Sequence, residues 1–155
     1  FENNVFAYPV QAAIDTHGSN GGFCGIRTAQ AASGWEGISS FTFRHNVVLL
    51  GNASATMLCE NRPGGFANMT LDANCYWNTA EAPGDIAFPT FSNDRDNTSF
   101  AAWQAHGKDR SSRIADPMFE PSVNPLTRFN KMDPRSQCRS IFNPIDTSRA
   151  GSTLA

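Results

Sequence analysis

Residues 43–48 read FRHNVV, and this stretch decides the expected fold because two other stretches repeat its pattern. Residues 1–6, FENNVF, and residues 71–77, LDANCYW, also place an asparagine three positions after one apolar residue and two before another. The asparagines Asn4, Asn46 and Asn74 are separated by 42 and 28 residues, and self-similarity at tens of residues is typical of repeat architectures. The short apolar alternation around each asparagine indicates strands rather than helices.

Stacked in parallel about 4.8 Å apart, such strands would form the coils of an all-β parallel solenoid. An asparagine side chain both donates and accepts hydrogen bonds, so Asn4, Asn46 and Asn74 are predicted to form a ladder along the stack. Asparagine also tolerates the left-handed backbone of a sharp corner. The pattern leaves open whether the stack that contains Val47 or the stack that contains Val48 faces the interior. The alternative is an ordinary β-sandwich in which the asparagines are turn residues.

The domain organisation follows from where the pattern stops. Residues 1–77 are expected to hold the coils, with a loop insertion at residues 18–37, which are rich in Gly, Ser and Ala. Residues 78–155 are rich in turn signals and are predicted to cap the same single domain, 1–155. Within them, residues 99–107 read as a short helix that begins at Thr98 or Ser99 and stops at Gly107.

The first strand pattern begins at the first residue of the sequence, which would leave an open strand edge. We therefore expect the chain to be the C-terminal part of a larger β-helix. Residues 1–8 are predicted to pair with N-terminal coils of the same protein or with a neighbouring protein chain.

Composition narrows the class of protein further. The net charge of −2 and a charged content of 17% disfavour a nucleic-acid-binding protein. No apolar run approaches the roughly 18–20 residues that a membrane span needs. An even number of cysteines and three sequons favour a secreted glycoprotein with disulfides. The cysteines, which allow three pairings, are Cys24, Cys59, Cys75 and Cys138, and the sequon asparagines are Asn52, Asn68 and Asn97.

Five segments carry a resemblance to a known group of proteins: FENN, FTFRHN, LDANCYW, FAAWQAHGKDRSSRIADPMF and IFNPIDTSRAG. Together they resemble the closing section of secreted right-handed parallel β-helix proteins of the pectate-lyase-like superfamily. The resemblance covers most of the chain outside residues 18–37 and departs at residues 136–138, where Ser-Gln-Cys replaces a usual Ser-Pro-Ala. It implies a right-handed parallel β-helix and a structural role for Trp103 as part of a cap. It also implies structural roles for Asp109 and Ser111, whose side chains are expected to bond backbone N–H groups in a turn. It also implies an extracellular, carbohydrate-related function, with a polysaccharide as a partner.

The search for a catalytic site leads to Asp15 and His17, which follow a predicted strand and alternate along it. A glycoside hydrolase needs two carboxylates, and a lyase needs a base beside the sugar. Glu36, His45 and Glu60 are further candidates, and a hydrogen-bonded turn is the alternative for Asp15 and His17. No cofactor is expected, and a calcium site built from scattered aspartates is left open.

Three functions therefore stay open. The first is the C-terminal portion of a polysaccharide hydrolase or lyase. The second is a non-catalytic structural or glycan-binding module of an extracellular or cell-surface assembly. The third is a β-sandwich lectin, which would show antiparallel pairing throughout.

Overall fold

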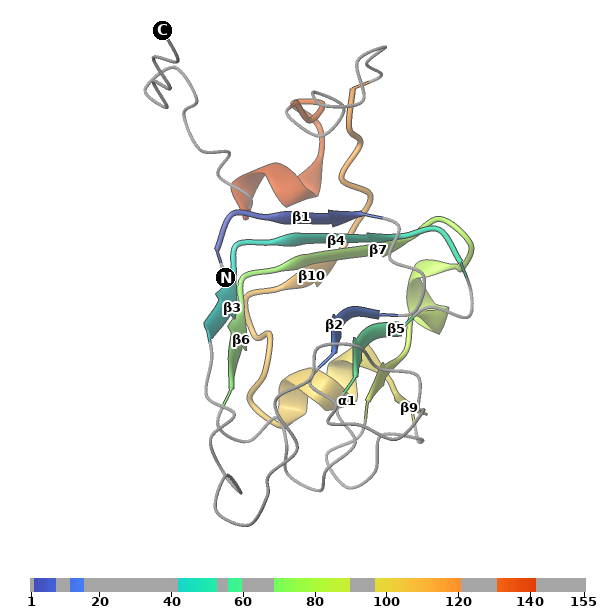
Figure 1. The fold of residues 1–155 in the computed structure, drawn as a ribbon, viewed down its shortest axis with the longest axis vertical. Helices are drawn as coiled ribbons and strands as arrows, with labels where there is room; N and C mark the ends of the chain where they lie inside the picture. The colour runs from blue at the N-terminus through green and yellow to red at the C-terminus, as the bar shows by residue number, and fades with distance from the viewer. Residues whose placement is uncertain are drawn as a thin grey trace, which may run out of the picture.

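The computed structural model describes residues 2–7, 12–15, 42–52, 56–59, 69–89, 97–120 and 131–141, and for residues 12–15, 56–59 and Pro89 it describes the backbone alone. The fold is mainly β, with short parallel sheets and little helix (Figure 1). No helix among these residues is long and apolar enough to cross a membrane.

The largest sheet joins four short strands that lie far apart in the sequence. In Figure 1 they run side by side across the upper part of the molecule in the order β1-β4-β7-β10. Their bounds are β1 Val5–Ala7, β4 Val47–Leu50, β7 Cys75–Asn78 and β10 Arg113–Ile114. Every neighbouring pair is parallel.

The register of this sheet aligns the repeated sequence motifs. Val5 pairs with Val47, and Val47 pairs with Cys75, so each asparagine stands at the same position before its strand. The fourth strand, β10, lies in the section that the sequence predicted as cap, and its Arg113 pairs with Cys75.

Two further sheets are also parallel. Strand β3, Thr42–Arg44, pairs with β6, Thr70–Asp72, and β2, Ala12–Asp15, pairs with β5, Thr56–Cys59. Among the described strands only β8, Phe88–Pro89, and β9, Asn97–Thr98, are antiparallel. A β-sandwich lectin with antiparallel pairing throughout is therefore wrong for this chain.

A left-handed residue stands before each ladder asparagine. Asn3, His45 and Ala73 have φ of 54°, 56° and 52°, although none is a glycine. The sequence analysis had assigned this backbone to the asparagines themselves. The asparagine side chain instead supports the corner from inside, because Asn46 Nδ2 donates to Arg44 O at 2.8 Å, across the left-handed residue.

Apolar residues on both faces of the large sheet are buried. One cluster contains Val48 and Tyr76 and packs against β3, β6 and the helix; its buried members are Phe43, Val48, Leu50, Met69, Leu71, Tyr76, Ile86, Phe88 and Trp103. The other contains Val47 and Cys75 on the opposite face, where Met132, Cys138 and Ile141 cover them. Both apolar stacks are thus interior, because the C-terminal segment packs on the outer face.

The only α-helix among the described residues, α1, spans Phe100–Ala105. Its N-cap is Ser99, whose Oγ accepts from the backbone N–H of Ala102 at 3.2 Å. Gly107, with φ of 87°, ends it by donating from its N–H to Gln104 O at 2.9 Å. Two 3-10 turns complete the elements: η1, Pro83–Asp85, and η2, Gln137–Ser140.

Candidate functional site

The three repeated asparagines form a hydrogen-bonded ladder between neighbouring strands. Asn4 donates to Asn46 Oδ1 from its backbone N–H at 2.9 Å and from Nδ2 at 3.1 Å. Asn46 donates to Asn74 Oδ1 in the same two ways, at 3.1 and 3.2 Å. Asn46 and Asn74 are fully buried. The amide oxygens of Asn46 and Asn74 therefore each accept two hydrogen bonds from the asparagine of the preceding strand in the sheet.

The ladder ends at residues 109–112 rather than at a fourth asparagine. The backbone N–H of Asn74 donates to Ser112 Oγ at 2.6 Å, and Asn74 Nδ2 donates to Asp109 Oδ1 at 2.9 Å. Ser112 Oγ in turn donates to the same Asp109 oxygen at 2.6 Å. The Ser112 hydroxyl and the Asp109 carboxylate together accept the two hydrogen bonds that the amide oxygen of a fourth asparagine would accept.

Asp109 is the centre of a buried polar cluster. Besides Asn74 and Ser112, its carboxylate accepts from Trp103 Nε1 at 2.8 Å and from the Tyr76 hydroxyl at 3.1 Å to each oxygen. Burial raises the pKa of Asp109, and these four donors pull it partly back. Burial and the nearby Asp109 raise the pKa of Tyr76 well above 10, so its hydroxyl keeps the proton that it donates.

The sequence analysis expected Asp109 and Ser111 to bond backbone N–H groups in a turn. The Asp109 carboxylate accepts from side chains instead, and Ser112 rather than Ser111 contacts it. Ser111 contributes its backbone N–H, which donates to Asp72 Oδ1 at 2.7 Å. The predicted structural role of Trp103 agrees with its complete burial and its stacking on Phe88.

Asp109 also fixes the position of an exposed hollow. Its backbone N–H donates to Leu71 O at 2.7 Å, which holds residues 107–112 against β6. Between them lies an open hollow of about 400 Å³, which we call the Lys108 hollow. Its lining residues are Met69, Thr70, Leu71, Asp72, Gly107, Lys108 and Arg110.

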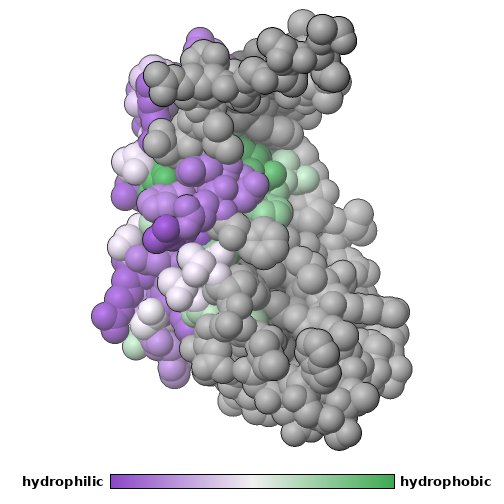
Figure 2. Space-filling model, turned by 60° about the vertical axis from the view of Figure 1, so that its left-hand side comes forward, coloured by the Kyte–Doolittle hydropathy of each residue, from purple (hydrophilic) through white to green (hydrophobic). Residues whose placement is uncertain are grey.

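The polar groups of the Lys108 hollow are two cations and one carboxylate. Lys108 Nζ donates to Met69 O, and partial burial lowers the pKa of Lys108. Arg110 is exposed, and its guanidinium lies beside Gly107. A Cβ atom added to Gly107 would stand 3.6 Å from Nη2 of Arg110. Asp72 is partly engaged by Ser111. In the view of Figure 2 the described residues are mainly hydrophilic, with smaller hydrophobic patches. Both cations line the hollow, and this arrangement can bind an anionic group.

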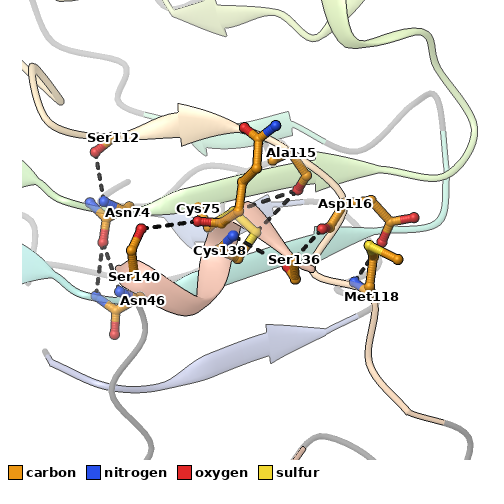
Figure 3. The surroundings of a disulfide bond; sticks show 11 residues. Asn46, Asn74, Cys75, Ser112, Ala115, Asp116, Met118, Ser136, Cys138 and Ser140 are labelled. Atoms are coloured by element: carbon orange, nitrogen blue, oxygen red, sulfur yellow. Dashed lines mark hydrogen bonds between the residues drawn. A yellow bond between two sulfur atoms is a disulfide. The ribbon is translucent and has the colours of Figure 1, made fainter. Parts of the chain in front are cut away.

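A disulfide joins the large sheet to the C-terminal segment. Cys75 in β7 is bonded to Cys138 in η2 across a sequence separation of 63 residues, with the two Cα atoms 5.5 Å apart. Figure 3 shows this bond beside the ladder, with the carbonyl group of Ala115 next to the sulfur atoms. Ser136 caps η2 by accepting from the Cys138 N–H at 3.2 Å. The four cysteines of the sequence allow three sets of pairings, and the Cys75–Cys138 bond belongs to one of them. The side chains of Cys24 and Cys59 lie outside the described residues.

The predicted catalytic pair falls largely outside the described part of the chain. Asp15 is the last residue of β2, where only the backbone is described, and His17 lies beyond it. Glu36 and Glu60 are likewise outside. His45, the remaining candidate, is half-buried, with Nδ1 3.0 Å from Ile141 O.

Two of the three sequon asparagines can be placed. Asn52 is exposed just after β4, and Asn97 is exposed at the start of β9. Asn68 lies outside the described residues. The exposure of Asn52 and Asn97 is compatible with glycosylation.

Sequence reasoning missed the Lys108 hollow. A loop after a helix has no period that predicts its neighbours. The backbone bond from Asp109 to Leu71, 38 positions earlier, and the bond from the Ser111 N–H to Asp72 bring Lys108 and Arg110 to β6.

Comparisons with known proteins add no identification. No family model, no curated protein and no solved structure matches this chain. Among the residues that the structure describes, no group of three or more His, Cys, Asp or Glu side chains could hold a metal ion.

Proposed function

We propose that the chain is the C-terminal portion of an extracellular right-handed parallel β-helix protein that acts on or holds polysaccharide. The sheet geometry supports the fold part of this proposal. In each of the three parallel sheets, β1-β4-β7-β10, β2-β5 and β3-β6, every strand pairs with the strand three places further along the chain. Asn4, Asn46 and Asn74 stand in register. Parallel crossover connections within one sheet are right-handed in almost all proteins, which favours that hand here.

The observation that carries the functional part is the Lys108 hollow. Two cations, Lys108 and Arg110, and one carboxylate, that of Asp72, line this open surface next to strand β6. An arginine fork matches the geometry of a carboxylate or sulfate, and a partly desolvated lysine adds a second charge. We assign this hollow to the binding of an acidic sugar unit of an extracellular polysaccharide. The disulfide favours the same oxidising location outside the cell.

The hollow fits binding better than hydrolysis. Its lining contains one carboxylate, Asp72, whereas glycoside hydrolysis needs two. If the protein is a hydrolase or lyase, the reaction is therefore proposed to use Asp15 and His17. Asp15→Asn and His17→Ala should then each abolish release of reducing ends or unsaturated products from a polyuronate, and unchanged turnover would remove both residues from the mechanism.

Binding to a polyuronate and to a neutral glucan of equal length tests the hollow. The wild-type protein should bind the polyuronate more tightly, and Arg110→Gln and Lys108→Met should each weaken that binding about tenfold, as expected for a lost charge-assisted bond of about 1.5 kcal/mol. Arg139→Gln is the matched control, because Arg139 is an exposed cation in η2 that does not line the hollow. Equal affinity for both glycans, or equal losses in all three variants, would refute the assignment.

A non-catalytic structural module is the second candidate, and the Asp109 cluster favours it. A carboxylate that is fully buried and bonded to four side-chain donors has no access to a substrate. This buried carboxylate is therefore an architectural element. Polyuronate binding without any turnover by the intact protein would decide for this candidate.

A further inference from the structure

Strands β3 and β6 lie side by side (Figure 1), and their sheet has a polar outer face. The middle residue of each strand is buried, Phe43 in β3 and Leu71 in β6, so the residues before and after it point outward. Arg44 at the end of β3 stands in register with Asp72 at the end of β6, and Asp72 lines the Lys108 hollow. The outer face therefore places a third cation, Arg44, one strand away from the carboxylate of the hollow.

The cations on this face lie on both sides of strand β6. The backbone of residues 109–111 runs along one edge of β6, because two of its N–H groups donate to the Leu71 carbonyl and to the Asp72 carboxylate, each at 2.7 Å. Arg44 lies along the other edge, in β3. Since neighbouring layers are about 4.8 Å apart, Arg44 and Arg110 are separated by about 10 Å along the stack, with Asp72 between them.

Arg44 keeps hydrogen-bond donors for a ligand. Half of its side chain is exposed, and its Nε donates to the Glu2 carboxylate. No described residue accepts from its two terminal nitrogens, and none accepts from the guanidinium of Arg110. The bond to Glu2 orients the Arg44 guanidinium and leaves the paired N–H groups of the terminal nitrogens open to a second carboxylate.

Asp72 sets what can lie between the two arginines. Its Oδ1 accepts from the Ser111 N–H, and no described residue donates to its Oδ2. An open carboxylate oxygen accepts a hydrogen bond from a hydroxyl group and repels another acid. The groups that a ligand presents to this face should therefore be an acid at Arg110, a hydroxyl at Asp72 and an acid at Arg44.

We propose that one acidic glycan chain crosses β6 from the Lys108 hollow to Arg44, with acidic units at Arg110 and Arg44 and a neutral unit over Asp72. The two-layer spacing is close to the length of two pyranose units in an extended chain. The proposal rests on the assignment of the hollow to an acidic sugar. It adds a second acid-binding position, a direction of the glycan across the strands, and a class of glycan in which acidic and neutral units alternate.

Two trisaccharides of equal length test the second position by titration calorimetry with the intact chain. One has a uronate at each end and a neutral hexose in the middle, and the other has a single uronate in the middle. The wild-type protein should bind the first at least tenfold more tightly, because only the first reaches both arginines. Arg44→Gln should weaken binding of the first about tenfold and of the second less than twofold. The Glu2–Arg44 pair is exposed, so this variant should keep its fold.

Arg135→Gln is the matched control, because Arg135 is also an exposed arginine paired with a carboxylate, and it does not line the hollow. It should change either affinity by less than twofold. Equal wild-type affinity for the two trisaccharides, or equal losses for both in Arg44→Gln, would overturn the inference. If Arg110→Gln then still weakens binding of both, the hollow assignment stands without the second position. If Arg110→Gln changes neither affinity, the hollow assignment and the inference fail together.

Discussion

Replacing Asp109 by asparagine tests whether this one carboxylate holds the closed end of the ladder together. The change keeps the side-chain volume, and asparagine tolerates the φ of 49° found at this position. It replaces one acceptor oxygen by an NH₂ group. With its NH₂ at the Oδ1 position the new amide faces the donors of Asn74, Ser112 and Tyr76, and with its NH₂ at the Oδ2 position it faces those of Trp103 and Tyr76.

The expected loss follows from the less costly of these two orientations. Keeping the oxygen toward Asn74 and Ser112 also keeps it within reach of the Tyr76 hydroxyl, so the NH₂ deprives Trp103 Nε1 of its acceptor, and Trp103 is fully buried. A buried group left without its partner costs about 1–3 kcal/mol. Asp109→Asn should therefore lower the free energy of unfolding by about 1–3 kcal/mol, out of the roughly 5–15 kcal/mol of a typical domain.

Urea unfolding followed by tryptophan fluorescence and circular dichroism measures this loss. Asp85→Asn is the matched control, since Asp85 is exposed in η1 and should change the free energy by less than about 0.5 kcal/mol. Trp103→Phe removes one donor, and the double variant with Asp109→Asn should lose less than the sum of the two. A loss for Asp109→Asn no larger than that of the control would refute the four-donor description.

Three further predictions concern the cap, an ion pair and the disulfide. Ser99→Ala should cost about 1 kcal/mol in urea unfolding through loss of the helix cap, and a Ser99→Thr variant that is equally destabilised would contradict this cause. Arg135 lowers the pKa of Asp133 from 3.8 to about 2, so the stability that the pair contributes is present above pH 3.8 and is lost as the pH falls toward 2. A titration followed by carbon-13 NMR should show the Asp133 midpoint near pH 2 in the wild-type protein and nearer 3.8 in Arg135→Gln. An Asp133 midpoint that is unchanged in Arg135→Gln would argue against the ion pair. Replacing both Cys75 and Cys138 by alanine should cost about 4 kcal/mol, given the separation of 63 residues, and an unchanged urea midpoint would show that the bond contributes nothing.

Much of the large sheet could be predicted from the sequence because its strands repeat a local signal. The asparagine pattern identified three of its four strands and their register, since identical side chains stack only when the strands are parallel and aligned. Strand β10 gave no such signal, because Ser112 and Asp109 replace the asparagine and only two residues follow in the strand. Strand β5, Thr56–Cys59, also has no asparagine before it and was missed.

The candidate site was much less predictable, because long-range contacts define it. Lys108 and Arg110 lie beside β6 because Asp109 bonds to Leu71 and Ser111 bonds to Asp72. The pairing of Cys75 with Cys138 similarly depends on how residues 131–141 fold back over the outer face of the sheet. Neither contact produces a repeating pattern in the sequence from which it could be predicted. The burial of both apolar stacks has the same origin, since an alternating pattern cannot reveal that a second layer covers the outer face.

Ser112 and Asp109 close the asparagine ladder at β10. They accept from the backbone N–H and from one side-chain N–H of Asn74, and the other side-chain N–H donates to Phe43 O at 3.0 Å, so every donor of Asn74 has an acceptor. Ser112 directs its own backbone N–H and its hydroxyl to Asp109 of the same chain. The same carboxylate accepts from Trp103 Nε1 in the helix, so one buried group joins the ladder to the helix. The loss predicted for Asp109→Asn therefore belongs to the large sheet and to the capping section at once.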